Sequence, residues 1–301
     1  MQKNNNDISL TVISLISAKL SDLAQLFKLR LGSLVVFSSL IGYLLLAPTF
    51  DFFALLMLSV GGFLVTGAAN AFNQIFEKDV DSLMVRTMNR PLPTGRMSPV
   101  EASLWAGIAA VLGLIILTVF FNLAAGLLSA LSLIIYSFIY TPLKRVHPIA
   151  VFVGAIPGAL PPMIGAVAYS GLIGNTAIYL FVLQFIWQFP HFWAIAWVAY
   201  EDYLRADIML LPSVGGKTRN SALNILIYTV TLIPITVVLY FLGYFNSIAL
   251  VVLLFAAVVF LIPAVKLMND TSDENARKVM FASFFYLPVA LIGLLIDKII
   301  F

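Results

Sequence analysis

The chain has 301 residues, of which 61% are hydrophobic and only 10% are charged. Its mean hydropathy of +1.03 exceeds what a soluble core requires, which excludes an ordinary soluble domain. Cysteine is absent, and its absence excludes both a disulfide framework and a thiolate metal site.

Stretches of roughly twenty apolar residues recur along the chain and predict an all-α, polytopic bundle of about nine transmembrane helices. The expected spans, in chain order, are 28–47, 52–76, 101–121, 123–141, 149–170, 175–199, 221–243, 246–267 and 279–300. We expect residues 1–301 to form a single integral-membrane domain. Residues 1–27 are expected to be a polar, partly amphipathic segment, and they lack the order of a signal peptide.

Basic residues gather on one side of this predicted topology. Sixteen of the 17 Lys and Arg residues precede or open the first span, or lie at or after the end of an even-numbered span, and Lys298 is the exception. Lys and Arg concentrate on the cytoplasmic side of membrane proteins. We therefore expect a cytoplasmic amino terminus, a functional site on the cytoplasmic side and insertion in the cell (inner) membrane.

One polar stretch between the second and third spans gathers four basic and three acidic residues. If the second helix continues into it, Asn73, Glu77 and Asp81 lie four apart on one stripe. An amide and two carboxylates form a ligand set suited to Mg²⁺, which also takes phosphate oxygens. Arg86 and Arg90 follow, and guanidinium groups match phosphate geometry. A solvated loop is the simpler alternative, but it does not explain polar groups at the end of an apolar helix.

A second acidic cluster follows the sixth span and contains Glu201, Asp202 and Asp207. Even-numbered spans end on the same side of the membrane, so both clusters are expected to face one compartment. We therefore predict two metal sites, or one shared site, around a polyphosphate.

The segment YTPLKR, between these clusters, supplies Tyr140, Lys144 and Arg145. Adjacent cations and a hydroxyl at the membrane boundary suit a phosphate group. An aromatic residue at the interface and a topology-setting pair of cations explain the same residues equally well. Both interpretations of this segment stay open.

Several blocks together carry a resemblance to a known family. The spacing Asn73-x₃-Glu77-x₃-Asp81 resembles the first motif of the UbiA superfamily of intramembrane prenyltransferases, in the form with Glu in the middle. The blocks MVRTMNRPLPTGRMSP, YTPLKR, GALPPMIG, QFPHFWAIAW and EDYLRADIMLLP follow in the order of its haem-farnesylating branch. The family's opening Lys-Pro-Arg reads Lys28-Leu29-Arg30 here, and in its second acidic motif Asp202 is matched but its partner is open.

This resemblance implies transfer of a farnesyl group from farnesyl diphosphate to the 2-vinyl group of haem B. Water is added, and the products are haem O and diphosphate. The implied cofactor is Mg²⁺, and a haem A synthase is a candidate partner. As metal-binding and catalytic residues we expect Asn73, Glu77, Asp81 and Asp202, with Glu201 or Asp207 as further ligands. As substrate-binding residues we expect Arg30, Arg86, Arg90, Tyr140, Lys144, Arg145 and His191.

The candidate haem contact is His191, which follows Pro190 inside the sixth span. An ionisable side chain within a span is costly and usually functional, and an imidazole there suits haem iron. A structural histidine bonded to a neighbouring helix, or to Gln184 or Gln188 one turn away, is the simpler alternative. The second histidine, His147, lies in a predicted loop.

Three other functions remain open at this point. A UbiA-type enzyme acting on a quinone precursor or another tetrapyrrole would share the acidic motifs. A secondary transporter would show inverted repeats and broken helices near the midplane, whereas the charges here gather at one face. A non-catalytic assembly or haem-carrier factor would need no diphosphate site.

Overall fold

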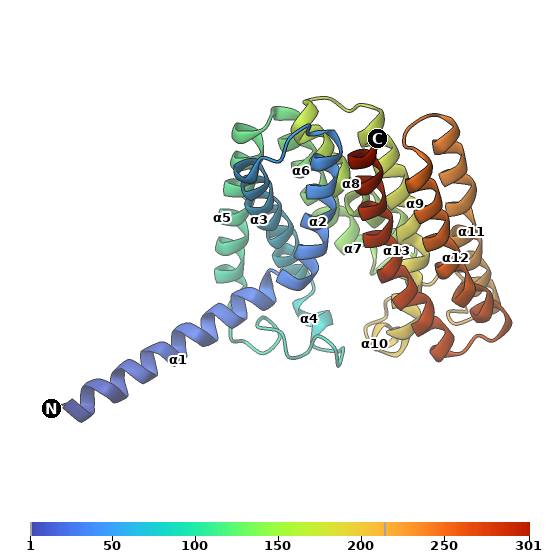
Figure 1. The fold of residues 1–301 in the computed structure, drawn as a ribbon. Helices are drawn as coiled ribbons and strands as arrows, with labels where there is room; N and C mark the ends of the chain where they lie inside the picture. Colours follow the sequence, from blue (N-terminus) through green and yellow to red (C-terminus); the bar gives the residue numbers. More distant parts are fainter. Residues whose placement is uncertain (1, 214) are drawn as a thin grey trace.

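The computed structural model describes the backbone of residues 2–213 and 215–301 and the side chains of residues 14–213 and 215–301 (Figure 1). Within these residues the regular structure is entirely helical. The helices are α1 (Gln2–Leu26), α2 (Leu29–Leu46), α3 (Phe52–Phe76), α4 (Lys78–Asp81), α5 (Pro99–Phe120), α6 (Leu123–Ile134), the π-helix η1 (Ile135–Tyr140), α7 (Thr141–Leu143), α8 (Ala150–Ser170), α9 (Asn175–Val198), α10 (Tyr200–Arg205), α11 (Arg219–Phe241), α12 (Ser247–Asn269) and α13 (Asp273–Ile300).

Nine helical segments of the described chain are long and apolar enough to cross a membrane. They are α2, α3, α5, the continuous run α6–η1–α7, α8, α9, α11, α12 and α13, and each coincides with a predicted span to within several residues. The predicted fold class is therefore confirmed. The expected amino-terminal segment corresponds to α1, but the side chains of residues 1–13 lie outside the described residues, so its amphipathic character stays a prediction.

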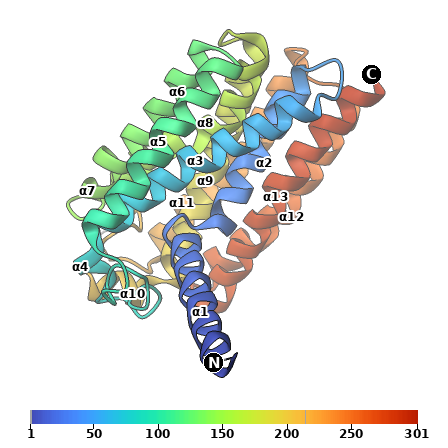
Figure 2. The ribbon, with the colours of Figure 1, turned by 90° about the vertical axis from the view of Figure 1, so that its left-hand side faces the viewer.

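Helix α8 forms the centre of the bundle, and 78% of the residues in its most apolar 18-residue stretch are buried. It packs against α2 and α6 on one side and against α9 on the other. Helices α3 and α5 complete the first half, and α11, α12 and α13 complete the second (Figures 1 and 2). Side chains that approach α8 from both halves therefore meet in the interior of the bundle.

Glycines let α2 and α8 approach each other closely. A Cβ atom at Gly42 would overlap the backbone carbonyl of Pro162, and one at Gly165 would overlap that of Ser39. Backbone atoms cannot rotate away as a side chain can, so these two positions accept only hydrogen. The hydrophobic effect does not drive helix association inside lipid, so helices associate there through close packing. Small residues at such crossings make that packing possible.

Helix α9 donates to two backbone carbonyls of α8, one of which a proline leaves without its helical donor. Pro162 has no N–H, so the carbonyl of Gly158 loses its helical donor. The Gln184 side-chain nitrogen donates to that oxygen at 2.7 Å, and the Gln188 nitrogen donates to the carbonyl of Ala155 at 2.6 Å. Neighbouring side chains commonly satisfy such groups in membrane helices. These two bonds join α9 to the central helix.

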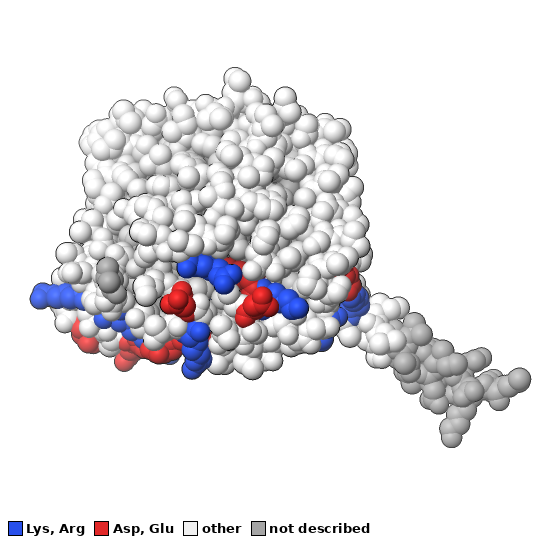
Figure 3. Space-filling view, turned by 180° about the vertical axis from the view of Figure 1, so that it is seen from behind, with Lys and Arg blue, Asp and Glu red and all other residues white. Residues whose placement is uncertain are grey.

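Charged side chains lie mainly at one end of the bundle. In the view of Figure 3, Lys, Arg, Asp and Glu form a band along one edge, while the opposite end carries none on that face. The ends of α3 and α9 and the loops after them lie within this band. The charge asymmetry seen in the sequence thus corresponds to one end of the folded chain.

Adding a side chain where α2 and α8 cross should lower the stability of the fold. Gly165→Ala is expected to lower the midpoint of thermal unfolding in detergent by several degrees, because overpacking costs about 1–3 kcal/mol. Gly107→Ala in α5 is the control, since a Cβ there meets no atom within 4 Å. Thermal unfolding followed by circular dichroism compares them, and equal midpoints would contradict the close crossing.

Candidate active site

The first acidic motif crosses a break between two helices without losing its alignment. Helix α3 ends at Phe76, and Glu77, with φ of −102° and ψ of 8°, joins it to α4. The Glu77 N–H donates to the Asn73 carbonyl at 3.0 Å, and the Asp81 N–H donates to the Glu77 carbonyl at 2.7 Å. Helical spacing therefore continues through the break, and the side chains are 3%, 2% and 0% exposed in chain order.

Lys28 brings the first partly buried cation to this motif. Its ammonium donates to the Asn73 amide oxygen at 3.1 Å, and the Asn73 amide nitrogen donates to the Thr141 hydroxyl at 3.2 Å. Lys28 adopts φ of 48° and ψ of 54°, a left-handed conformation that strains a residue with a Cβ. Burial and repulsion from Arg90 and Lys144 lower the pKa of Lys28 to about 7. A nearby anion would favour its charged form.

Two further cations meet the carboxylates. Arg90 donates to Asp81 Oδ2 at 2.7 Å, and Lys144 forms an ion pair with Glu77 Oε1. The side chains of Arg90 and Lys144 are only 18% and 11% exposed, so water screens these pairs weakly. With Lys28 the cluster contains three basic groups and two carboxylates, an excess of cations that suits a polyanion.

Asp202, in the second acidic cluster, binds the loop that follows the first. Its Oδ1 accepts from the Val85 N–H and its Oδ2 from the Arg86 N–H, both at 3.1 Å. Arg205 also donates to Oδ1 at 2.9 Å. The two acidic clusters therefore lie next to each other, as expected, and Asp202 connects them through the backbone.

The two remaining acidic candidates, Glu201 and Asp207, are exposed. In the part of the chain that the structure describes, no three His, Cys, Asp or Glu side chains come together in a group that could hold a metal ion. The structure brings together Asn73, Glu77 and Asp81, and it leaves Glu201 and Asp207 at the surface.

The other candidate cations differ in their surroundings. Arg86 is exposed and lies over the Tyr203 ring at 5.7 Å, whereas Arg145 is exposed on the loop after α7. Arg30, which is exposed, and Tyr140, which is half-buried, both line a large cavity of the bundle. Arg86 and Arg145 are thus the candidates at the surface that do not line the cavity.

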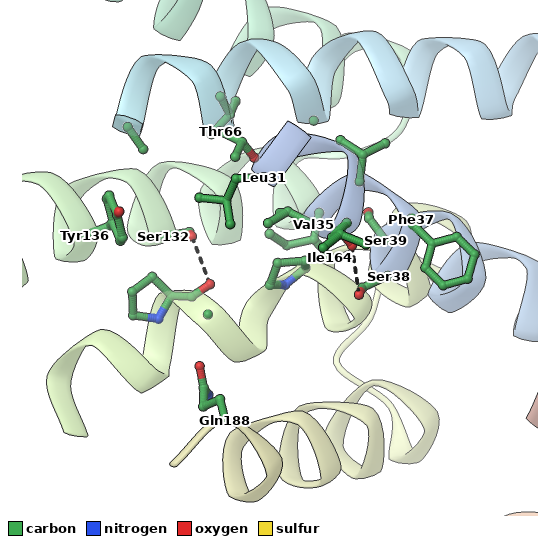
Figure 4. A pocket seen from close by; sticks show the side chains of 18 of the residues that line it. Leu31, Val35, Phe37, Ser38, Ser39, Thr66, Ser132, Tyr136, Ile164 and Gln188 are labelled. Carbon is green, nitrogen blue, oxygen red and sulfur yellow. Dashed lines mark hydrogen bonds between the residues drawn. The ribbon is translucent and has the colours of Figure 1, made fainter. Parts of the chain in front are cut away.

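An apolar cavity of about 540 Å³ occupies the centre of the bundle (Figure 4). Its walls come from α2, α3, α5, α6, η1, α8, α9 and α13. Arg30, Asn70 and Tyr140 line it near the cation cluster, since Asn70 lies one turn before Asn73. Its volume falls within the range of small-molecule sites, about 300–1,000 Å³. Aromatic walls include Phe37, Tyr136, Trp187 and Phe192.

His191 also lines this cavity. Its Nδ1 is 2.8 Å from the Ser283 hydroxyl on α13, and its ring stacks on Trp187 with centroids 4.6 Å apart. Gln184 and Gln188 bond to α8 and are not its partners. The bond to a neighbouring helix matches the structural alternative for this histidine, and its place in the cavity wall matches the functional one.

The structure adds residues that sequence reasoning did not assign to the site. These are Lys28, Asn70, Tyr136, Thr141 and Ser283. Asn70 had a signal in the sequence, since it is a polar residue near the end of an apolar span. Ser283 had none, because it is separated from His191 by 92 residues.

Comparisons with known proteins agree with this geometry. Residues 35–287 match the UbiA prenyltransferase family. A protohaem IX farnesyltransferase of Cytophaga hutchinsonii is 44% identical over 91% of this chain and 96% of its own length. A solved digeranylgeranylglyceryl phosphate synthase structure has a TM-score of 0.74 at 20% identity, covering 94% of this chain and all of the other.

A second solved structure, of a UbiA homologue from Archaeoglobus fulgidus, is bound to DMAPP and Mg²⁺. Its TM-score is 0.63 at 15% identity, and the match covers 91% of this chain and 99% of that one. At these identities the two structures support the fold. The sequence relative supports the family at high coverage.

The Asp202 contacts should hold the loop in place. Asp202→Ala is expected to increase tryptic cleavage at Arg86 about ten-fold, because each lost hydrogen bond costs on the order of 1 kcal/mol. The control is Glu201→Ala, which removes an exposed neighbouring carboxylate. Limited proteolysis measures both rates, and equal cleavage of the two variants would show that the loop does not depend on Asp202.

Proposed function

This chain belongs to the UbiA prenyltransferase family, and we propose that it transfers a farnesyl group from farnesyl diphosphate to the 2-vinyl group of haem B. The C–O bond to diphosphate breaks, a C–C bond forms at the vinyl group, and water supplies the hydroxyl of haem O. Diphosphate and one proton leave. The single observation that carries this proposal is one apolar cavity with a buried cation cluster beside it and an imidazole in its wall.

The chain is an integral membrane protein. We place it in the inner membrane with the cation cluster on the cytoplasmic side, because Lys and Arg concentrate there. The band of charge in Figure 3 and the position of the acidic motif at the same end support this orientation. Farnesyl diphosphate would then present its anionic end to the cytoplasmic side and its chain to the membrane interior.

The diphosphate end of the substrate fits the cation cluster. Lys28, Arg90 and Lys144 are partly buried around Asn73, Glu77 and Asp81, and Arg30 lies at the cavity wall nearby. Charge builds on the diphosphate oxygens as the allylic C–O bond breaks. Cations already held in a site that excludes water stabilise that charge strongly. Arg86 and Arg145 act further out, as exposed cations near the entrance.

The residues of the first motif fit Mg²⁺. Asp81 Oδ1 is buried and has no hydrogen-bond partner in the described chain, so it is available to a cation. We propose that Asn73, Glu77 and Asp81 hold the ion together with diphosphate oxygens, since Mg²⁺ uses one or two carboxylates with phosphates and water. The ion would withdraw charge from the leaving diphosphate. Direct ligation by Asp202, Glu201 or Asp207 stays a prediction.

The farnesyl chain and the haem fit the apolar cavity. Phe37, Tyr136, Tyr140, Trp187 and Phe192 line it, and electron-rich ring faces stabilise an allylic cation. The apolar walls also keep water away from that cation until the vinyl carbon has attacked. Among the Phe, Tyr and Trp side chains of α9, Trp187 and Phe192 line the cavity and are therefore the proposed contacts of the substrates.

The imidazole in the cavity favours haem over the other acceptors. A quinone precursor offers no metal for His191 to bind, whereas haem iron accepts histidine readily. The product would be the substrate of a haem A synthase, which we therefore retain as a proposed partner.

The metal-ligand assignment is tested with two neighbouring aspartates. Asp81→Asn should lower haem O formation by about 100-fold or more, because the buried carboxylate loses its charge. Asp79→Asn, in the same short helix but exposed, should leave turnover near the wild-type rate. Purified protein is incubated with haem B, farnesyl diphosphate and Mg²⁺, and haem O is measured by mass spectrometry. Failure of wild type to form haem O would exclude the proposed activity.

The role of Arg90 is tested by a change that keeps its charge. Arg90→Lys loses the guanidinium fork, so KM for farnesyl diphosphate should rise about ten-fold while haem affinity stays constant. Arg96→Lys serves as control, since Arg96 pairs with Asp22 of α1 outside the cluster. A loss of haem affinity with an unchanged KM would reverse the assignment.

A further inference from the structure

We propose that Nε2 of His191 is an axial ligand of the haem iron and that Ser283 is the positioning residue that prepares it. This inference rests on the proposed function and names the atom through which the acceptor is held. It follows from a chain of hydrogen bonds, from the aromatic contacts of the ring and from the cavity that the ring lines.

Ser283 determines which ring nitrogen carries the proton. Its hydroxyl lies 2.6 Å from the Met280 carbonyl, which can only accept, so the hydroxyl proton is directed there. The hydroxyl oxygen then accepts from Nδ1 of His191 at 2.8 Å. In the neutral ring Nδ1 therefore carries the hydrogen and Nε2 carries a free lone pair. Histidines that bind metals show this arrangement, with the other ring N–H donated to a fixed acceptor.

Aromatic side chains hold the plane of the ring. Trp187 stacks on it with a centroid separation of 4.6 Å and an interplanar angle of 20°, and Phe284 meets it at 5.2 Å and 66°. The Trp187 indole N–H also donates to the Ser283 carbonyl at 3.0 Å. The stacking residue and the hydrogen-bonding residue are thereby attached to each other. The imidazole is held by three side chains from α9 and α13, as a ligand of defined direction requires.

Of the two ring nitrogens of His191, Nε2 is the one without a hydrogen-bond partner in the described part of the chain. Among the residues that the structure describes, His191 makes one hydrogen bond, through Nδ1, and its other contacts are with aromatic rings. A polar atom left unsatisfied in an apolar cavity costs free energy. Coordination of iron would satisfy it, since neutral imidazole is a common iron ligand.

Ligation would also orient the acceptor. The iron lies at the centre of the macrocycle, so one axial bond limits the macrocycle to rotation about that bond. The walls of the cavity restrict this rotation, because the rings of Trp187, Phe192 and Phe284 line it in contact with His191. A vinyl group can then be held at one position relative to the diphosphate end, where Arg30 and Tyr140 line the cavity. Fixed orientation of two reactants lowers the barrier to their reaction.

The test uses the haem itself as the spectroscopic probe. Wild-type protein titrated with ferric haem B should show the absorption and electron paramagnetic resonance signals of imidazole-ligated iron. His191→Gly should lose these signals and bind haem at least ten-fold more weakly, and added imidazole should restore both. His147→Ala is the control, because its ring lies in an exposed loop and accepts from the Ile149 N–H.

Two further variants test Ser283. Ser283→Ala should weaken haem binding several-fold and make ligation more dependent on pH, because the tautomer is no longer fixed. Ser283→Thr keeps the hydroxyl and should restore both properties. A Ser283 with a merely structural role would lower thermal stability without changing the pH profile of the iron signals, and that result would overturn its positioning role.

Haem O formation is measured on the same preparations to separate the two hypotheses. If wild type forms haem O and His191→Gly keeps the wild-type iron signals, the ligation is wrong and the proposed function stands. If His191→Gly keeps those signals but loses turnover, the imidazole acts as a proton acceptor and the ligation is again wrong. If wild type forms no haem O, the proposed function is wrong, whatever the iron signals are.

Discussion

Burial of charge at the end of α3 is the constraint on which the rest of the site depends. An ion removed from water costs several kcal/mol unless another charge and good hydrogen bonds compensate it. Glu77 and Asp81 are 2% and 0% exposed. Arg90 pairs with Asp81 from the loop that follows it, and Lys144 pairs with Glu77 from a segment distant in sequence. Arg90 therefore holds the loop after α4 against the motif, and Lys144 draws the segment after α7 to it. The same pairing that makes burial of the carboxylates tolerable assembles the proposed diphosphate site, and Lys28 adds the excess cation.

Two membrane-spanning helices of the site end in the same way, at a break followed by a short helix. Helix α3 continues into α4 through Glu77, with φ of −102° and ψ of 8°, and helix α9 continues into α10 through Ala199, with φ of −95° and ψ of 18°. In both places a membrane-spanning helix ends and a short one carries acidic residues beyond it. Asp202 on the second short helix then binds backbone N–H groups of the loop after the first. Two similar helix ends are thus joined directly, which explains why the two acidic clusters lie together.

The sequence predicted what depends on local order, and it missed what depends on distant contacts. The spans follow from apolar runs, and the alignment of Asn73, Glu77 and Asp81 follows from helical spacing, which persists through the break. The direction of the Asp202 carboxylate could not be predicted, because its partners are backbone groups more than 100 residues away. Lys28 was visible as a cation, but its contact with Asn73 requires a left-handed conformation that no pattern indicates.

Helix α9 connects the two ends of the proposed reaction. Gln184 and Gln188 fix it to α8, His191 lies one turn further along, and Asp202 follows just after its end. The proposed acceptor contact and Asp202, which holds the loop after α4, therefore belong to one continuous segment. A shift of α9 along its axis would move both together, so the distance between the two proposed substrate sites depends on a single packed helix. Residues on rigid helices hold a reactive geometry more accurately than residues on loops. Pro162 of α8, which leaves the Gly158 carbonyl free to accept from Gln184 of α9, thus helps to fix the position of α9 in the bundle.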